Sequence, residues 1–138
     1  MYKRIMVPID LAHTESAETM VKAALTLADQ DGEITLVHVM PEIPAIVATH
    51  LPEGAADKAR GHAEEQLQDI AGQSGAGRTI KTLVRVGNPH YGILEAADEN
   101  SSDLIIIASH QPALSDYLLG STAAKVVRHA RCSVHVIR

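Results

Sequence analysis

Five short apolar segments alternate along the chain with four longer segments whose apolar residues recur every three or four positions. The short segments predict β-strands, and the longer ones predict helices that bury one face. In the first helical segment Thr14 or Ser16 is placed to cap the start. Its apolar stripe comprises Ala17, Met20, Val21, Ala24, Leu25 and Ala28. Strands are expected at 3–9, 33–39, 79–86, 103–108 and 132–137, and helices at 14–29, 56–72, 90–100 and 118–130.

This alternation of strands and helices predicts right-handed βαβ crossovers and one parallel sheet. Residues 104–107 are apolar throughout, as expected of a strand covered on both faces. Segments 80–86 and 132–137 carry polar side chains partway along, which is typical of edge strands. The third and fifth strands are therefore placed at the edges, and the first and fourth inside. The prediction is an α/β, doubly wound, five-stranded parallel sheet of order 3-2-1-4-5, with helices on both faces.

The composition agrees with this fold and with a single domain over residues 1–138. The chain has no Trp or Phe and only three Tyr, although 46% of its residues are hydrophobic. Its core must therefore be aliphatic, which suits a parallel sheet covered by helices. A domain of this length buries enough surface to fold without a disulfide or a metal.

Charge and cysteine content exclude several classes of protein. The formal net charge is −5 and no cluster of Lys or Arg occurs, so nucleic-acid binding is not expected. The single cysteine, Cys132, excludes an internal disulfide, and the His spacing does not suggest a zinc site. Neither a secretory signal nor an 18-residue apolar run occurs, which predicts a cytoplasmic protein without membrane insertion.

The order 3-2-1-4-5 has its reversal point between the first and fourth strands, and ligands bind beyond the carboxyl ends of strands at such points. Asp10 follows the first strand, and Ala108 and Ser109 end the fourth. Gly120 and Ser121 then open the last helix, whose N-terminal N–H groups can hold an anion. The sequence therefore predicts a phosphate site at this point.

Residues 40–54 are expected to form a long irregular connection, with prolines at 41, 44 and 52. Connections of this length in a compact domain are usually functional or mobile. A lid over the predicted site and a solvated loop are both compatible with the sequence.

Several separated motifs, in order, resemble the universal stress protein family. They run from one end of the chain to the other, and the Pro that follows Gln111 is most similar to the F/G-type branch. ATP-binding members carry Gly-x-x-Gly, nine residues, and then Gly-Ser or Gly-Thr. This chain has Ala108 and Gln111 at the first two glycines and an eight-residue spacer, and it matches fully at Gly120-Ser121. The motifs are MYKRIMVPID, ITLVHVMP, VRVGNP, DLIIIASHQ, LLGSTAAKVVRHA and CSVHVIR.

The resemblance implies an adenine nucleotide (ATP, ADP or AMP), with or without Mg²⁺. By that resemblance, Asp10 lies beside the ribose and phosphates, directly or through a metal and water. Pro8 and Ile9 form the wall, and the backbone of Val39 faces adenine. The phosphates are expected to meet Ala108, Ser109, His110, Gln111, Gly120, Ser121 and Thr122. His110 is interpreted as a binding residue, because no Ser-His-Asp or Cys-His constellation accompanies it.

The last strand is also a candidate interface. An uncovered apolar edge strand invites pairing, and self-pairing about a two-fold axis is a common solution. Family members dimerise through this strand, so the resemblance implies a homodimer through residues 132–137.

Two other functions remain open. The substitutions at Ala108 and Gln111 favour an interaction protein of the same fold that binds a protein partner and no nucleotide. Slow ATP hydrolysis or self-modification is the other alternative, with Ser109, Ser121 and Thr122 as acceptors. No catalytic residue is assigned, and whether the protein is an enzyme is left open.

Overall fold

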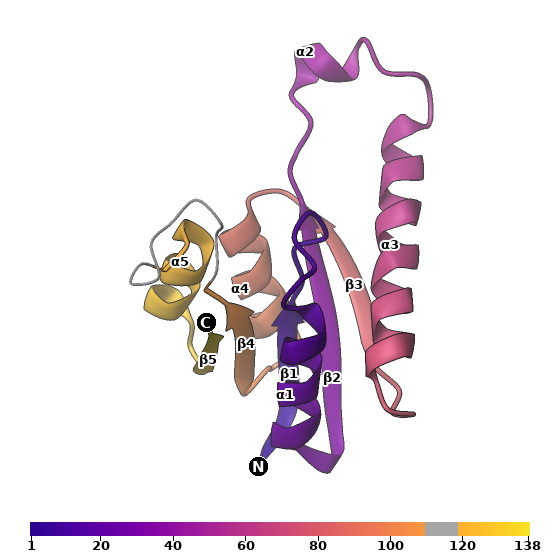
Figure 1. Ribbon diagram of the computed structural model, residues 1–138. Helices are drawn as coiled ribbons and strands as arrows, with labels where there is room; N and C mark the ends of the chain where they lie inside the picture. Colours follow the sequence, from indigo (N-terminus) through magenta and orange to yellow (C-terminus); the bar gives the residue numbers. More distant parts are fainter. Residues whose placement is uncertain (110–118) are drawn as a thin grey trace.

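The computed structural model describes residues 1–109 and 119–138. Its strands form a single sheet in the order β3-β2-β1-β4-β5, and every neighbouring pair is parallel. The predicted α/β fold class and strand order are therefore confirmed (Figure 1). The strands are β1 (Tyr2–Pro8), β2 (Ala28–Met40), β3 (Lys81–Val86), β4 (Leu104–Ala108) and β5 (Ser133–Ile137).

Helices cover both faces of the sheet because successive side chains of each inner strand point to opposite faces. Ile5 and Val7 belong to one core cluster, and Met6 between them belongs to the other. The first cluster packs under α1 and α3, and the second under α4 and α5. The helices are α1 (Ala17–Leu27), α2 (Ala45–Ala48), α3 (Ala55–Ser74), α4 (Pro89–Glu99) and α5 (Ser121–His129).

The first helix and the second strand differ from the prediction at their boundary. α1 ends at Leu27, and β2 begins at Ala28 rather than at residue 33, because Ala28 pairs with Tyr2 ahead of a shift in register. The predicted side-chain cap is also wrong. Ser16 has helical dihedral angles and its side chain makes no capping hydrogen bond, and Thr14 contributes its carbonyl, which accepts from the N–H of Ala17.

The connection predicted to be irregular contains the four-residue helix α2. Its first turn is closed by N–H groups of Val47 and Ala48, which both donate to the carbonyl of Pro44. No residue of α2 is buried, and Ile46 is 75% exposed. In Figure 1 this segment extends beyond the carboxyl end of β2, away from the sheet.

The last two helices begin at residues that favour a helix N-terminus. In α4, Pro89 occupies the first turn, and the side chain of Asn88 accepts the N–H of Tyr91, as expected for a proline at a helix start. α5 begins at Ser121 rather than at residue 118, with Gly120 at the cap position. Cys132 precedes β5 and is partly buried against the core cluster under α4 and α5.

Candidate functional site

A cleft of about 470 Å³ lies beyond the carboxyl ends of the inner strands, where the strand order reverses. We call it the strand-end cleft. Most of its lining comes from four segments, namely residues 8–13 from the end of β1 onward, 37–39 near the end of β2, 107–109 at the end of β4, and 120–123 at the start of α5. The rest is contributed by Glu15, Ser16, Met20, Pro41, Pro89 and Ile93. The volume is within the range of small-molecule sites, roughly 300–1,000 Å³. This is the location that the reversal of strand order predicts.

Most of the residues predicted from the sequence line this cleft. They are Pro8, Ile9, Asp10, Val39, Ala108, Ser109, Gly120, Ser121 and Thr122. Two further predictions, His110 and Gln111, fall on residues 110–118, which lie outside the described part of the chain. The structure thus brings together residues that are as far apart in sequence as Pro8 and Thr122.

The turn after β1 fixes the main chain around Asp10. Its Oδ1 accepts the N–H of Ala12 at 3.0 Å, and its carbonyl accepts the N–H of His13 at 3.0 Å. Such turns are characteristic of Asp, because its short carboxylate reaches the N–H two residues further on. The side chain of Asp10 is exposed at the cleft and presents a carboxylate to any ligand there.

The opposite side of the cleft is formed by the end of β4 and the start of α5. Ser109 donates its N–H to the carbonyl of Ile137 at 2.8 Å, and its own carbonyl accepts the N–H of Gly120 at 3.1 Å. These bonds attach the first residues of α5 to the sheet. The N–H groups of the first turn of a helix have no partners within the helix and carry the positive end of its dipole. The α5 end of the cleft can therefore hold an anion.

Ala108, at a position where the resemblance implies a glycine, requires no unusual backbone geometry. In the described part of the chain, the residues other than glycine with positive φ are Ala76 and Ser101. Ala108 therefore has an ordinary φ, and its methyl group adds bulk to the cleft wall without backbone strain.

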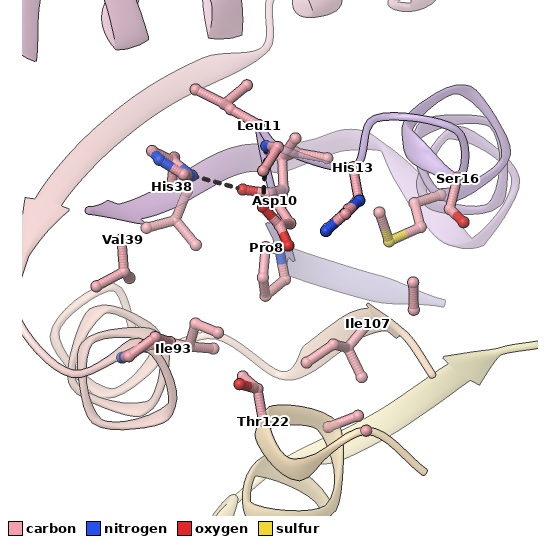
Figure 2. Close-up of a pocket in the computed structure, with 18 of the residues that line it drawn as sticks. Pro8, Asp10, Leu11, His13, Ser16, His38, Val39, Ile93, Ile107 and Thr122 are labelled. Carbon is pink, nitrogen blue, oxygen red and sulfur yellow. Dashed lines mark hydrogen bonds between the residues drawn. The ribbon is translucent and has the colours of Figure 1, made fainter. Parts of the chain in front are cut away.

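Two histidines at the cleft were not selected from the sequence. His38 lies beside Val39 on β2, and its Nδ1 is 2.9 Å from the carbonyl oxygen of Ile9. His13 follows Asp10 in the same turn and also lines the cleft (Figure 2). The only signal in the sequence was their position within three residues of a predicted site residue.

Basic side chains gather at the seam between α4 and α5, next to the cleft. The pKa of His90 is lowered by burial and by the nearby charges of Lys125 and His129. Pro89, the residue before His90, lines the cleft. Because its pKa is lowered, the His90 imidazole is uncharged near pH 7 and adds no positive charge to the cleft.

The described residues do not contain a preformed metal centre. Within residues 1–109 and 119–138, no group of three or more His, Cys, Asp or Glu side chains could hold a metal ion. The same part of the chain has no helix that is long and apolar enough to span a membrane.

Comparison with known proteins identifies relatives over the full length. The sequence model of the universal stress protein family matches residues 1–138. Universal stress protein G of Salmonella typhimurium is 37% identical to this chain over 145 residues, and the match covers 100% of each protein.

Solved structures with this fold cover nearly the whole chain. The structure of hypothetical protein MJ0577 has a TM-score of 0.82 at 28% identity, covering 99% of this chain and 96% of that one. A universal stress protein in complex with cAMP has a TM-score of 0.71 at 21% identity, covering 99% of this chain and 97% of that one. The predicted resemblance to the family is therefore confirmed.

Proposed function

Because the chain belongs to the universal stress protein family, we propose that it binds an adenine nucleotide in the strand-end cleft, either ATP or its products ADP and AMP. The observation that carries this proposal is the pairing of Asp10 on one wall with the N-terminus of α5 on the other. A carboxylate suits ribose hydroxyls, which can donate hydrogen bonds, and a helix N-terminus suits phosphates. The related structure in complex with cAMP supports an adenine nucleotide as the ligand class.

The adenine ring is assigned to the end of β2. The carbonyl of Val37 accepts the N–H of Ile9 and so points toward β1. The main-chain groups of a strand alternate in direction, so those of Val39, two residues further on, point the same way. β1 has ended at Pro8, and the N–H and C=O of Val39 therefore face the cleft and suit the polar edge of adenine. Pro8 and Ile9 form the adjacent wall.

The phosphates are assigned to the first turn of α5. The N–H groups of Ser121 and Thr122, together with their hydroxyls, are the donors proposed there. Ser109 is 6% exposed and its main-chain groups are already paired, so its contribution is limited to its hydroxyl. His110 and Gln111 remain proposed phosphate donors.

A magnesium ion is proposed to enter with the nucleotide. Mg²⁺ is commonly held by one or two carboxylates together with substrate phosphates and waters. Asp10 is the carboxylate that this proposal assigns to it, directly or through water.

Calorimetric titration of the nucleotide-free protein with ATP and Mg²⁺ tests the proposal. Nucleotide that copurifies is first released by denaturation and identified, and the protein is refolded before titration. Asp10→Ala and Gly120→Val are each expected to weaken binding about tenfold or more, equivalent to about 1.4 kcal/mol. Asp69→Ala is the matched control, since it removes an exposed carboxylate of α3 outside the cleft.

Absence of heat with ATP, ADP and AMP in the wild-type protein would overturn nucleotide binding. In that case the alternative of an interaction protein with the same fold would gain support. Intact mass after incubation with ATP and Mg²⁺ separates simple binding from self-modification at Ser109, Ser121 or Thr122. An unchanged mass and no ADP above a blank would argue against the enzymatic alternative.

A homodimer through β5 is the second part of the proposal. β5 is at the end of the sheet and pairs with β4 along one side. The carbonyl of Ile137 points toward β4, where it accepts the N–H of Ser109, so by alternation the main-chain groups of Val134 and Val136 point to the outer edge. Those groups can pair with a second copy of the strand, since an unpaired edge is a template for strand addition.

Two proline substitutions in β5 distinguish an effect on the dimer from an effect on the sheet. Val136→Pro removes an outward N–H and should yield a monomer by sedimentation with little change in the ladder to β4. His135→Pro removes an inward N–H and should instead destabilise the fold, because proline cannot donate to the ladder. A monomeric wild-type protein at micromolar concentration would contradict the proposal.

A further inference from the structure

His38 interrupts an apolar face of β2. Side chains at even positions of this strand face α1 and α3, and Ile34 and Leu36 there are 1% and 0% exposed. The next residue on that face is His38, whose Nδ1 lies 2.9 Å from the carbonyl oxygen of Ile9 (Figure 2). A carbonyl oxygen can only accept a hydrogen bond, so Nδ1 carries the proton and donates it.

This bond completes the attachment of Ile9 to β2. Ile9 follows the last residue of β1, and its N–H donates to the carbonyl of Val37 at 2.8 Å. With the His38 bond, both main-chain groups of Ile9 are held by β2. A residue just past the end of a strand ordinarily lacks the second of these bonds, because the ladder has stopped.

The His38 bond also sets the orientation of the peptide that joins Ile9 to Asp10. The described chain contains no cis peptide bond, so the C=O of Ile9 and the N–H of Asp10 point in opposite directions. The C=O points toward β2, where His38 holds it. The N–H of Asp10 therefore points away from β2, toward the β4 side of the strand-end cleft, where α5 presents its own N–H groups.

We propose that His38 is a positioning residue for the nucleotide: it fixes the Ile9–Asp10 peptide so that the N–H and the carboxylate of Asp10 both face the ligand. This inference rests on the proposed function and adds a residue to its site. Without the donor at position 38, the peptide can rotate, and the turn that holds the carboxylate loses its orientation. The ring itself needs no contact with the nucleotide.

Two variants of His38 separate positioning from packing. His38→Leu keeps an apolar body but removes the donor, whereas His38→Asn places an amide N–H₂ close to the position of Nδ1. Loss of groups that orient ligands typically costs about 10–100-fold in affinity at metal sites. By analogy we expect His38→Leu to raise the Kd for ATP and Mg²⁺ about tenfold, and His38→Asn to remain within about threefold of wild type.

The matched control is His62→Leu, an exposed histidine on α3 that does not line the cleft. Its Kd should equal that of wild type. Unfolding midpoints of all variants are measured in parallel. If His38→Asn restores nucleotide affinity although it is no more stable than His38→Leu, the loss of affinity in His38→Leu is due to positioning and not to general destabilisation.

The possible failures can be told apart. If wild type binds ATP and His38→Leu binds equally well, the positioning role is overturned and the nucleotide site stands. If wild type binds no nucleotide, the proposed function fails and this inference fails with it. Should His38→Leu not fold, NMR of the wild-type imidazole provides the test. A proton on Nδ1 with coupling to the Ile9 carbonyl supports the proposal, and an unprotonated Nδ1 overturns it.

Discussion

Gly92 of α4 lies against Val39 of β2 so closely that a Cβ atom at position 92 would be 2.9 Å from both γ-carbons of the valine. The absence of a side chain at Gly92 therefore allows α4 to approach the end of β2. Val39 is also a wall of the strand-end cleft. The shape of the cleft thus depends on a helix contact that has no polar group in it.

Gly92→Ala adds only one methyl group but is expected to displace Val39 and so change the shape of the cleft. Replacing a helical glycine by alanine gains about 1 kcal/mol in helix propensity, but forcing a methyl into a packed contact costs about 1–3 kcal/mol. Val39 is β-branched and cannot move aside easily. We expect a net loss of up to about 2 kcal/mol in the free energy of unfolding, and weaker nucleotide binding.

The control for this substitution is Gly61→Ala in α3, where a Cβ would have no neighbour within 4 Å. That variant should gain about 0.5–1 kcal/mol and leave binding unchanged. Urea denaturation and titration of both variants make the comparison. Equal behaviour of the two alanines would contradict the close approach of Gly92 and Val39.

Asp103 should make stability depend on pH in the acid range. Burial acts to raise the pKa of its carboxyl group, but backbone N–H groups of Lys3 and Arg4 outweigh this effect and lower it. They donate to the carboxylate at 2.8 and 2.9 Å. A lowered pKa in the folded state gives stability that is complete above the unfolded pKa of about 3.9. That stability is lost as pH falls through the folded pKa.

Asp103→Asn is expected to lower the free energy of unfolding by about 1–2 kcal/mol near pH 7, because hydrogen bonds to a charged group are the stronger ones. The difference from wild type should shrink below about pH 4, where Asp103 begins to be protonated in the unfolded chain but stays ionised in the folded protein. Unfolding curves across this range test both statements. A difference that is constant with pH would show that the charge of Asp103 is not responsible.

Cys132 should react slowly with alkylating reagents in the folded protein. Burial raises the pKa of its thiol, and the carboxylates of Asp98 and Asp103 raise it further. The thiolate is the reactive form, so near pH 7.5 iodoacetamide should label the folded protein about tenfold or more slowly than the denatured chain. Asp98→Asn should speed the reaction modestly. Equal rates in the folded and denatured states would refute the prediction.

Arg78 should stabilise the end of the sheet that lies away from the cleft. One nitrogen of its guanidinium donates to the carbonyls of Asp29 and Gly32 at 3.0 and 2.7 Å, and to that of Gln30 at 3.4 Å. Arg78→Ala would leave the partly buried carbonyls of Asp29 and Gly32 without this donor, at a cost of about 1–3 kcal/mol.

Hydrogen exchange should rise in residues 28–32 of the Arg78→Ala variant while nucleotide affinity stays the same. The exposed Arg131 provides the control, since Arg131→Ala should change neither quantity. Loss of nucleotide binding in Arg78→Ala would contradict the separation of the two ends of the sheet.

The sequence by itself determined the strand order and the position of the strand-end cleft. An apolar β4 flanked by more polar segments indicates which strands are inner and which are edges, because burial on both faces excludes polar side chains. The order then places Asp10 and Ser109 at one end of two inner strands. The predictions at Asp10 and Gly120 depended on this reasoning and on family motifs, and both residues line the cleft.

Only the tertiary structure decided the contacts between segments that are distant in sequence. The early start of β2 depends on pairing with Tyr2, and the bonds of Arg78 are made to the first residues of β2, more than forty residues away. The roles of His38 and Gly92 likewise follow from distances to Ile9 and Val39 across elements. Periodicity reports which face of an element is buried, but it carries no information on which atoms meet there, because that depends on how the elements pack together.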